Sequence, residues 1–233
     1  MDRQFSLKGK KIAVFDLESK ECAGENGIGW KDYDKIGISV GVAYFYETDE
    51  YKVFMDDNIN DLADRLLFCD LVTGFNIDGF DIPLLSAITK KNLAPVNTYD
   101  VLYYSRRSMG WDKNQRFPSG MKLDDHLEAT FGRDKMKTAH GSEAPKMWKE
   151  ARFGNLISYC MDDVKRERML FENIYYQGWC ATPTHGRTTP DIWPVLKAII
   201  PNLEPPKPII PETPIGSTSD SNKSESVPYA RRI

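Results

Sequence analysis

Alternation of hydrophobic and polar side chains predicts strands in the first half of the chain. In residues 11–18, KIAVFDLE, Ala13, Phe15 and Leu17 share one face of a strand. The opposite face carries Ile12, Val14, Asp16 and Glu18. The same reasoning predicts further strands at residues 36–46, 51–55, 71–75 and 97–103.

Hydrophobic residues spaced three and four apart predict helices that alternate with these strands. The helices are expected at residues 59–69, 82–91, 123–131 and 153–177. In the first of them Leu62, Leu66 and Leu67 would face the core. Gly132 and Gly178 follow the last two, at positions typical of a helix end. Three strands followed by alternating helices and strands predict an α/β layered fold with a mixed sheet.

The composition fits one globular domain followed by a tail. The 233 residues are 41% hydrophobic and 28% charged, which suits a substantial core. The character changes after about residue 200, because half of the 14 prolines lie in residues 201–233, together with the run GSTSDSNKSES. We therefore expect a domain over residues 1–200 and a disordered Pro- and Ser-rich tail over residues 201–233.

Charge and cysteine content narrow the class of protein further. The net charge of −3 offers no global basic field for nucleic acid, so any such binding must come from local patches. No stretch approaches the roughly 18 apolar residues of a membrane span, and the start, MDRQFSLKGKK, lacks the apolar region of a signal peptide. The four cysteines form no CxxC pair. These features predict an intracellular, cytoplasmic protein with reduced thiols and no membrane partner.

Acidic residues in three short motifs carry the chemistry that the sequence suggests. Asp16 and Glu18 lie two apart on one strand face, at the end of an apolar run. Asp81 directly precedes the predicted helix that begins with Ile82-Pro83, so it occupies the N-cap position. Capping alone would explain an aspartate there. A third acid, Asp163, lies late in the chain. Carboxylates that converge on one point repel each other unless hard cations such as Mg²⁺ lie between them.

Helical geometry separates the two neighbouring acids of the third motif. The apolar stripe of helix 153–177 is formed by Phe153, Ile157, Cys160, Val164 and Phe171. At about 100° per residue, Asp163 lies roughly 80° from the centre of this stripe and Asp162 roughly 180° away. Asp162 is therefore predicted to face solvent and Asp163 to lie at the margin of the core. Tyr159 lies one turn before Asp163 on the same side, whereas Glu167 falls inside the apolar stripe without an evident reason.

Taken in order, the three motifs resemble those of a known enzyme family. The match consists of Asp16 and Glu18 for Asp-x-Glu, Asn76, Phe80 and Asp81 for Asn-x2–3-Phe/Tyr-Asp, and Tyr159 and Asp163 for Tyr-x3-Asp. This set resembles the DEDD exonucleases of the ribonuclease H-like superfamily, in the subgroup that carries Tyr; the sister subgroup has His where Ser158 stands. The nearest likeness is to stand-alone exonucleases related to the proofreading domain of family B DNA polymerases.

The resemblance implies a fold, an activity and a cofactor. The fold would be a ribonuclease H-like sheet of three antiparallel strands followed by parallel strands, flanked by helices. Two Mg²⁺ or Mn²⁺ ions would be bound, one by Asp16, Glu18 and Asp163 and the second by Asp16 and Asp81. Tyr159 would orient the attacking water. The implied activity is hydrolysis of single-stranded nucleic acid from its 3′ end to nucleoside 5′-monophosphates, with DNA slightly favoured over RNA.

Basic and aromatic residues are interleaved in residues 133–152, immediately before the third motif. Cations can follow phosphates and aromatic rings can stack on bases, which suits single-strand binding. The candidate substrate-binding residues are Asn76, Phe80, Lys137, Trp148, Lys149 and Arg152. A solvated helix or loop would show the same run of charges, so both interpretations remain open.

Two other functions remain compatible with the same motifs. One is an RNA-trimming 3′–5′ exoribonuclease of the ribonuclease D type. The other is a catalytically weak exonuclease fold that serves as a nucleic-acid-binding or scaffolding module. A missing acidic residue would favour the second alternative, and the sequence lacks none of the four.

Overall fold

A mixed sheet of five strands forms the centre of the molecule. The computed structural model describes residues 6–111, 121–132 and 143–199. The strands are β1 (Ile12–Ser19), β2 (Ile38–Phe45), β3 (Glu50–Phe54), β4 (Leu71–Gly74) and β5 (Thr98–Asp100). Their order across the sheet is β3–β2–β1–β4–β5. The pairs β1–β2 and β2–β3 are antiparallel, whereas β1–β4 and β4–β5 are parallel. The predicted α/β fold with a mixed sheet is confirmed.

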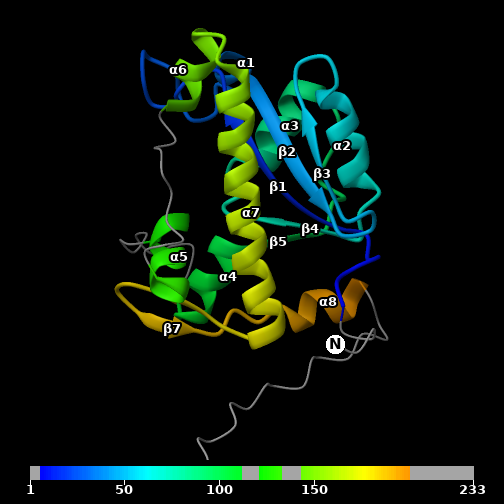
Figure 1. The fold of residues 1–233 in the computed structure, drawn as a ribbon, viewed down its shortest axis with the longest axis vertical. Coiled ribbons are helices and arrows are strands. Elements are labelled where there is room, and N and C mark those ends of the chain that lie inside the picture. The colour runs from blue at the N-terminus through cyan, green and yellow to red at the C-terminus, as the bar shows by residue number, and fades with distance from the viewer. Residues whose placement is uncertain (1–5, 112–120, 133–142, 200–233) are drawn as a thin grey trace, which may run out of the picture.

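Helices cover both faces of this sheet (Figure 1). They are α1 (Tyr33–Ile36), α2 (Ile59–Leu67), α3 (Asp81–Thr89), α4 (Val101–Ser108), α5 (Leu123–Phe131), α6 (Ala144–Lys149), α7 (Phe153–Gln177) and α8 (Trp193–Ile199). The long helix α7 crosses one face, and α2 and α3 lie on the other. A small hairpin of β6 (Cys180–Thr182) and β7 (Gly186–Thr188) follows α7.

The alternation in β1 distributes its side chains between two cores, as predicted. Ile12 and Val14 are buried in the core beneath α7, and Ala13, Phe15 and Leu17 pack in the core beneath α2 and α3. Because successive strand residues point to opposite faces, Asp16 and Glu18 continue the α7 side of the strand. The sheet thus delivers two carboxylates to the face that α7 covers.

Two predicted strands have different boundaries in the structure. The strand predicted at 97–103 is limited to β5, because Asp100 caps a helix, α4, through a hydrogen bond from Tyr103 N to its carboxylate. The strand predicted from residue 36 begins at Ile38, since Tyr33–Ile36 form one helical turn. Gly37 ends this turn with φ of 61°, a conformation that glycine adopts without strain. The sequence analysis did not anticipate α1, α4, α6, α8 or the β6–β7 hairpin.

Two hydrophobic residues expected in the core are exposed. Leu67 is 40% exposed at the last turn of α2, where Leu62 and Leu66 already fill the buried side. Phe153 is 40% exposed because it is the first residue of α7 and packs against Trp148 rather than the sheet. The proposed tail, residues 201–233, lies outside the described residues. Among the residues that the structure describes, no helix has the length and apolar character needed to cross a membrane.

Candidate active site

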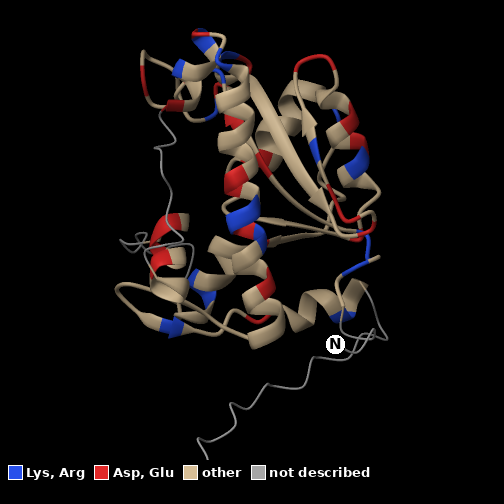
Figure 2. Cartoon of the chain, in the orientation of Figure 1, with Lys and Arg blue, Asp and Glu red and all other residues tan. Residues whose placement is uncertain are grey.

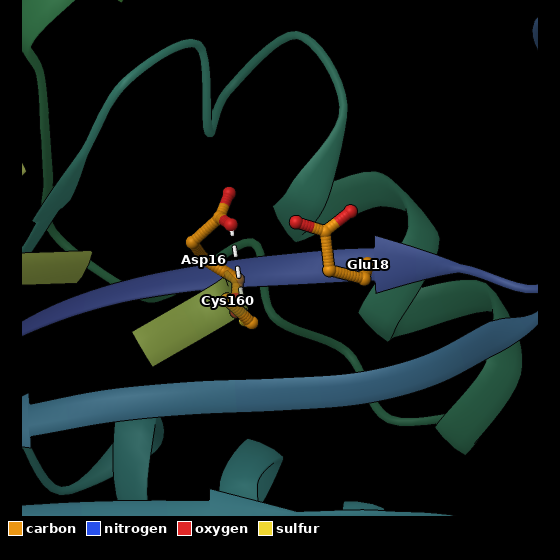
Figure 3. Close-up of side chains that lie close together, drawn as sticks. All are labelled: Asp16, Glu18 and Cys160. Atoms are coloured by element: carbon orange, nitrogen blue, oxygen red, sulfur yellow. Dashed lines mark hydrogen bonds between the residues drawn. The ribbon is translucent and has the colours of Figure 1, made fainter. Parts of the chain in front are cut away.

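The first motif places two carboxylates side by side on β1. Asp16 and Glu18 project from the same side of the strand, toward α7 (Figure 3). One oxygen of each carboxylate and the sulfur of Cys160 on α7 all lie within 4.8 Å of one another. The Cys160 thiol donates hydrogen bonds to the backbone and side-chain oxygens of Asp16, at 3.5 and 3.8 Å. Glu18 is only 8% exposed, so this acidic end of the strand is part of the interior.

The second motif brings Asp81 to the same place from the other side of the sheet. Its Oδ1 accepts a hydrogen bond of 3.2 Å from the backbone N–H of Leu17, the residue between the two acids of β1. Asp81 is the first residue of α3 rather than its N-cap, so the capping explanation is wrong: the carboxylate binds β1 instead. Burial raises the pKa of Asp81 well above its usual range, and the nearby charge of Asp16 raises it further.

The loop before Asp81 is fixed by Asp100. The Asp100 carboxylate accepts hydrogen bonds from the backbone N–H groups of Asn76 and Asp78, both at 3.1 Å, as well as capping α4. Asn76 adopts φ of 67°, which an asparagine tolerates. Asp100 is therefore a buried capping residue that also anchors this loop. Asn76 itself is exposed and Phe80 is half-buried.

The third motif adds Tyr159 and Asp163 from α7. Asp163 is 4% exposed, whereas the side chain of Asp162 is 58% exposed and pairs with Lys165 at 2.9 Å. The predicted orientation of the two neighbours is thus confirmed. Tyr159 is buried, and its pKa lies well above the usual value because of burial and then the charges of Asp163, Glu18 and Asp16. The phenol ring therefore lies among the carboxylates of the first and third motifs.

A fifth carboxylate, that of Glu167 on α7, is buried close to Asp16, Asp81 and Asp163. Its Oε1 accepts a hydrogen bond of 3.2 Å from Phe75 N, and its Oε2 is buried without a hydrogen-bond partner. A Cβ on Gly74 would lie 2.5 Å from Ile77 Cγ2, 2.7 Å from the Phe15 carbonyl oxygen and 3.3 Å from Glu167 Oε2, so only glycine fits this crowded position beside the carboxylate. Burial and the charges of Asp16, Asp81 and Asp163 raise the pKa of Glu167 well above its usual range. The signal for this residue was its position inside the apolar stripe.

Arg166 on α7 contacts this acidic group directly. The Arg166 guanidinium bonds to Asp163 Oδ1 through Nη2, and Nη1 lies 3.7 Å from Oδ1 of Asp124 on α5. Its Nε donates to the backbone carbonyl of Asp162 at 3.2 Å. The sequence analysis assigned Arg166 no role, because nothing in its spacing distinguishes it from the other charged residues of α7.

The basic residues expected at the substrate side have acidic partners. Lys149 pairs with Glu21 at 2.7 Å, and Arg152 pairs with Glu150 at 2.7 Å. Trp148 is half-buried; it packs against Phe153, and the Lys20 ammonium lies 4.6 Å from its ring centre. A pocket of about 350 Å³ lies between α6 and the loop after β1, and its lining mixes acidic, basic and uncharged residues. These residues are Glu21, Cys22, Glu25, Asn26, Pro145, Lys146, Lys149 and Glu150. Lys137 lies outside the described residues.

The donor set at the centre fits a hard divalent cation. Carboxylate oxygens are the ligands that Mg²⁺ and Mn²⁺ prefer. Oxygens of Asp16 and Glu18 lie within 4.8 Å of each other, whereas Asp81 on α3 and Asp163 on α7 lie outside this close group. The buried Oε2 of Glu167, surrounded by other acids and without a hydrogen-bond partner, also requires positive charge or a proton nearby. No family model matches the chain, and a search of curated proteins finds no match either.

Proposed function

We propose that this chain is a metal-dependent 3′–5′ exonuclease that hydrolyses single-stranded nucleic acid. One observation carries the proposal: Asp16, Glu18 and Asp163 lie close enough to Tyr159 for their charges to act on it, and Asp81 binds the strand residue between Asp16 and Glu18. These residues follow the order and spacing of the DEDD exonuclease motifs. The sheet order and strand directions are compatible with a ribonuclease H-like fold.

The residues of the site have distinct tasks in this mechanism. Asp16, Glu18 and Asp163 would hold one Mg²⁺ or Mn²⁺ ion, and Asp16 with Asp81 a second. Such ions supply an activated water and neutralise charge on the leaving 3′ oxygen. Tyr159 stays protonated at neutral pH, as a phenol of ordinary pKa does. It therefore serves to orient the water by a hydrogen bond and not to remove its proton.

Asp100 and Glu167 hold the second motif in register with the other two. Asp100 fixes the backbone of residues 76 and 78, and Glu167 fixes the backbone of Phe75 to α7. Asp81 follows this loop directly, so its position depends on both anchors. Nucleoside 5′-monophosphates would be the products, and we propose DNA as the slightly preferred substrate.

Incubation of 5′-labelled DNA and RNA oligonucleotides with the protein tests the proposal. With Mg²⁺ or Mn²⁺ we expect a ladder that shortens from the 3′ end, and with EDTA no cleavage. The matched control is Asp16→Ala, which removes the carboxylate shared by both ions and should abolish cleavage while the protein remains folded. Cleavage by Asp16→Ala equal to wild type would contradict the two-metal site. Faster shortening of the RNA substrate would favour the exoribonuclease alternative.

Binding without cleavage would support a different function. If the protein binds single-stranded oligonucleotides in the presence of Mg²⁺ but releases no nucleotide, the binding-module alternative is correct and the carboxylates have another role. Measuring binding by fluorescence anisotropy on the same oligonucleotides distinguishes the two outcomes.

A further inference from the structure

Arg166 is positioned at the junction of the acidic site and α5. It lies three residues after Asp163, in the next turn of α7, and its guanidinium contacts the Asp163 carboxylate. Its positive charge also acts on the Tyr159 hydroxyl, where it lowers the pKa that the surrounding acids raise. Arg166 therefore lies next to both members of the third motif.

The environment of Arg166 differs from that of its neighbour Lys165. The side chain of Arg166 is 13% exposed, whereas that of Lys165 is 53% exposed and pairs with the equally exposed Asp162. A cation that has given up most of its hydration must be compensated by anions that remain in place. Arg166 is thus built into the site, and Lys165 is on the surface.

The guanidinium has donors left after its contacts within the protein. It carries five N–H groups in a rigid planar fork. Nε and Nη2 make hydrogen bonds to Asp162 O and to Asp163, whereas Nη1 lies 3.7 Å from Asp124, beyond hydrogen-bond length. A phosphate can therefore be bound without any loss of the contact to Asp163.

We propose that Arg166 binds a phosphate group of the nucleic-acid substrate beside Asp163. This inference rests on the proposed nuclease function and adds a substrate-binding residue to it. Guanidinium and phosphate match as paired hydrogen-bond donors and acceptors, and such charge-assisted bonds are stronger than neutral ones. Of the candidate cations, Lys149 and Arg152 pair with glutamates outside the three motifs, whereas Arg166 contacts one of the four motif carboxylates.

The test is binding of a labelled oligothymidylate in Ca²⁺, which occupies oxygen sites and supports little cleavage. Arg166→Gln should weaken binding about tenfold or more, as expected for one lost charged hydrogen bond. The log–log dependence of affinity on salt should flatten by about 0.7, the value for one phosphate contact to a single strand. Arg166→Lys should restore part of the affinity, because it keeps the charge and loses the fork. Lys165→Gln is the matched control and should bind like wild type.

A second measurement separates phosphate binding from support of Asp163. Calorimetric titration with Mn²⁺, without nucleic acid, should show equal or tighter ion binding in Arg166→Gln, since a positive charge near Asp163 has been removed. Loss of ion binding in this variant would mean that Arg166 only holds Asp163 in place, and would overturn the proposal. Oligothymidylate affinity equal to wild type, or an equal loss in Lys165→Gln, would also overturn it.

The same experiments separate failure of this inference from failure of the proposed function. If Asp16→Ala loses Mn²⁺ binding and Arg166→Gln binds oligothymidylate like wild type, the metal site stands and only the role of Arg166 is wrong. If the wild-type protein binds neither Mn²⁺ nor oligothymidylate, both proposals are wrong. Thermal melting of each variant confirms that a loss of binding is not a loss of fold.

Discussion

Two charged regions of this molecule differ in how deeply their charged side chains are buried and in how those side chains are paired. In the acidic site, Glu18, Asp81 and Asp163 are less than 9% exposed, and they come from segments that are distant in the sequence. In the basic segment 143–152, the charged residues are exposed and pair with acids close by, for example Lys149 with Glu21. Figure 2 shows the mixture of blue and red residues around α6.

The difference shows that charged side chains are buried in one of these regions and exposed in the other. Exposed ion pairs contribute about 0–1 kcal/mol and are screened by salt, so the basic segment presents little net field. Carboxylates that are buried close together repel each other, and a divalent ion bound between them relieves this repulsion. A bound cation would therefore relieve more repulsion at the acidic site than at the basic segment.

The largest expected effect is the difference between two adjacent aspartates. Asp163→Asn should lower the cleavage rate by more than about 100-fold. Replacing a residue that only orients a metal ligand typically costs about 10- to 100-fold in activity, and replacing a proposed ligand such as Asp163 should cost more. Asp162→Asn should keep most of the activity, since its side chain faces solvent. Initial rates with Mg²⁺ on one oligonucleotide check this order.

Tyr159→Phe should have an intermediate effect on the cleavage rate. It removes the hydroxyl that we propose orients the water, and leaves the proposed metal ligands in place, so its rate should fall between those of the two aspartate variants. Asp163→Asn keeps a hydrogen-bond acceptor for Arg166 but removes the anion that compensates its charge, so its melting temperature should fall below that of Tyr159→Phe. The opposite order of the aspartate variants would show that the site has been assigned to the wrong face of α7.

Glu167→Gln should have a smaller effect, which raises the stability of the metal-free protein and weakens ion binding. An acid whose pKa is raised in the folded state destabilises the fold as the pH rises above its unfolded-state pKa. At pH 7 glutamine removes this cost while its oxygen still accepts from Phe75 N, so the metal-free protein should melt at a higher temperature. Mn²⁺ should bind more weakly, because one negative charge near Asp16 and Asp81 is gone.

Glu172→Gln on the same helix is the matched control for this pair of measurements. Glu172 accepts hydrogen bonds from Tyr46 and Arg168, at 3.0 and 2.8 Å, so its replacement should lower the melting temperature and leave Mn²⁺ binding unchanged. A lower melting temperature for Glu167→Gln as well would indicate that the ionised carboxylate stabilises the metal-free fold, against the inference from its pKa.

The faces of strands and helices that are buried could be predicted from the sequence, whereas contacts between distant segments of the chain could not. The alternation in β1 gave the correct faces for Asp16 and Glu18, because burial forces a period of two on a strand. The same periodicity could not reveal that Asp81 binds Leu17 N, or that Asp100 fixes the preceding loop, since both contacts join segments far apart in the chain. The pairing of Lys149 with Glu21 is also a contact between distant segments.

The smallest expected effect belongs to the basic segment. A triple variant of Lys146, Lys149 and Arg152 to Ala should change oligothymidylate affinity in Ca²⁺ by less than about threefold, because exposed pairs with glutamates contribute about 0–1 kcal/mol each. Three direct phosphate contacts would instead flatten the salt dependence by about 2 in log–log slope. Replacement of Glu21 and Glu150 by Gln serves as the paired variant, which frees the cations and should tighten binding modestly. A slope change near 2 in the triple variant would show that the glutamates release these cations to the substrate, and the contrast between the two regions would then hold only for the protein without nucleic acid.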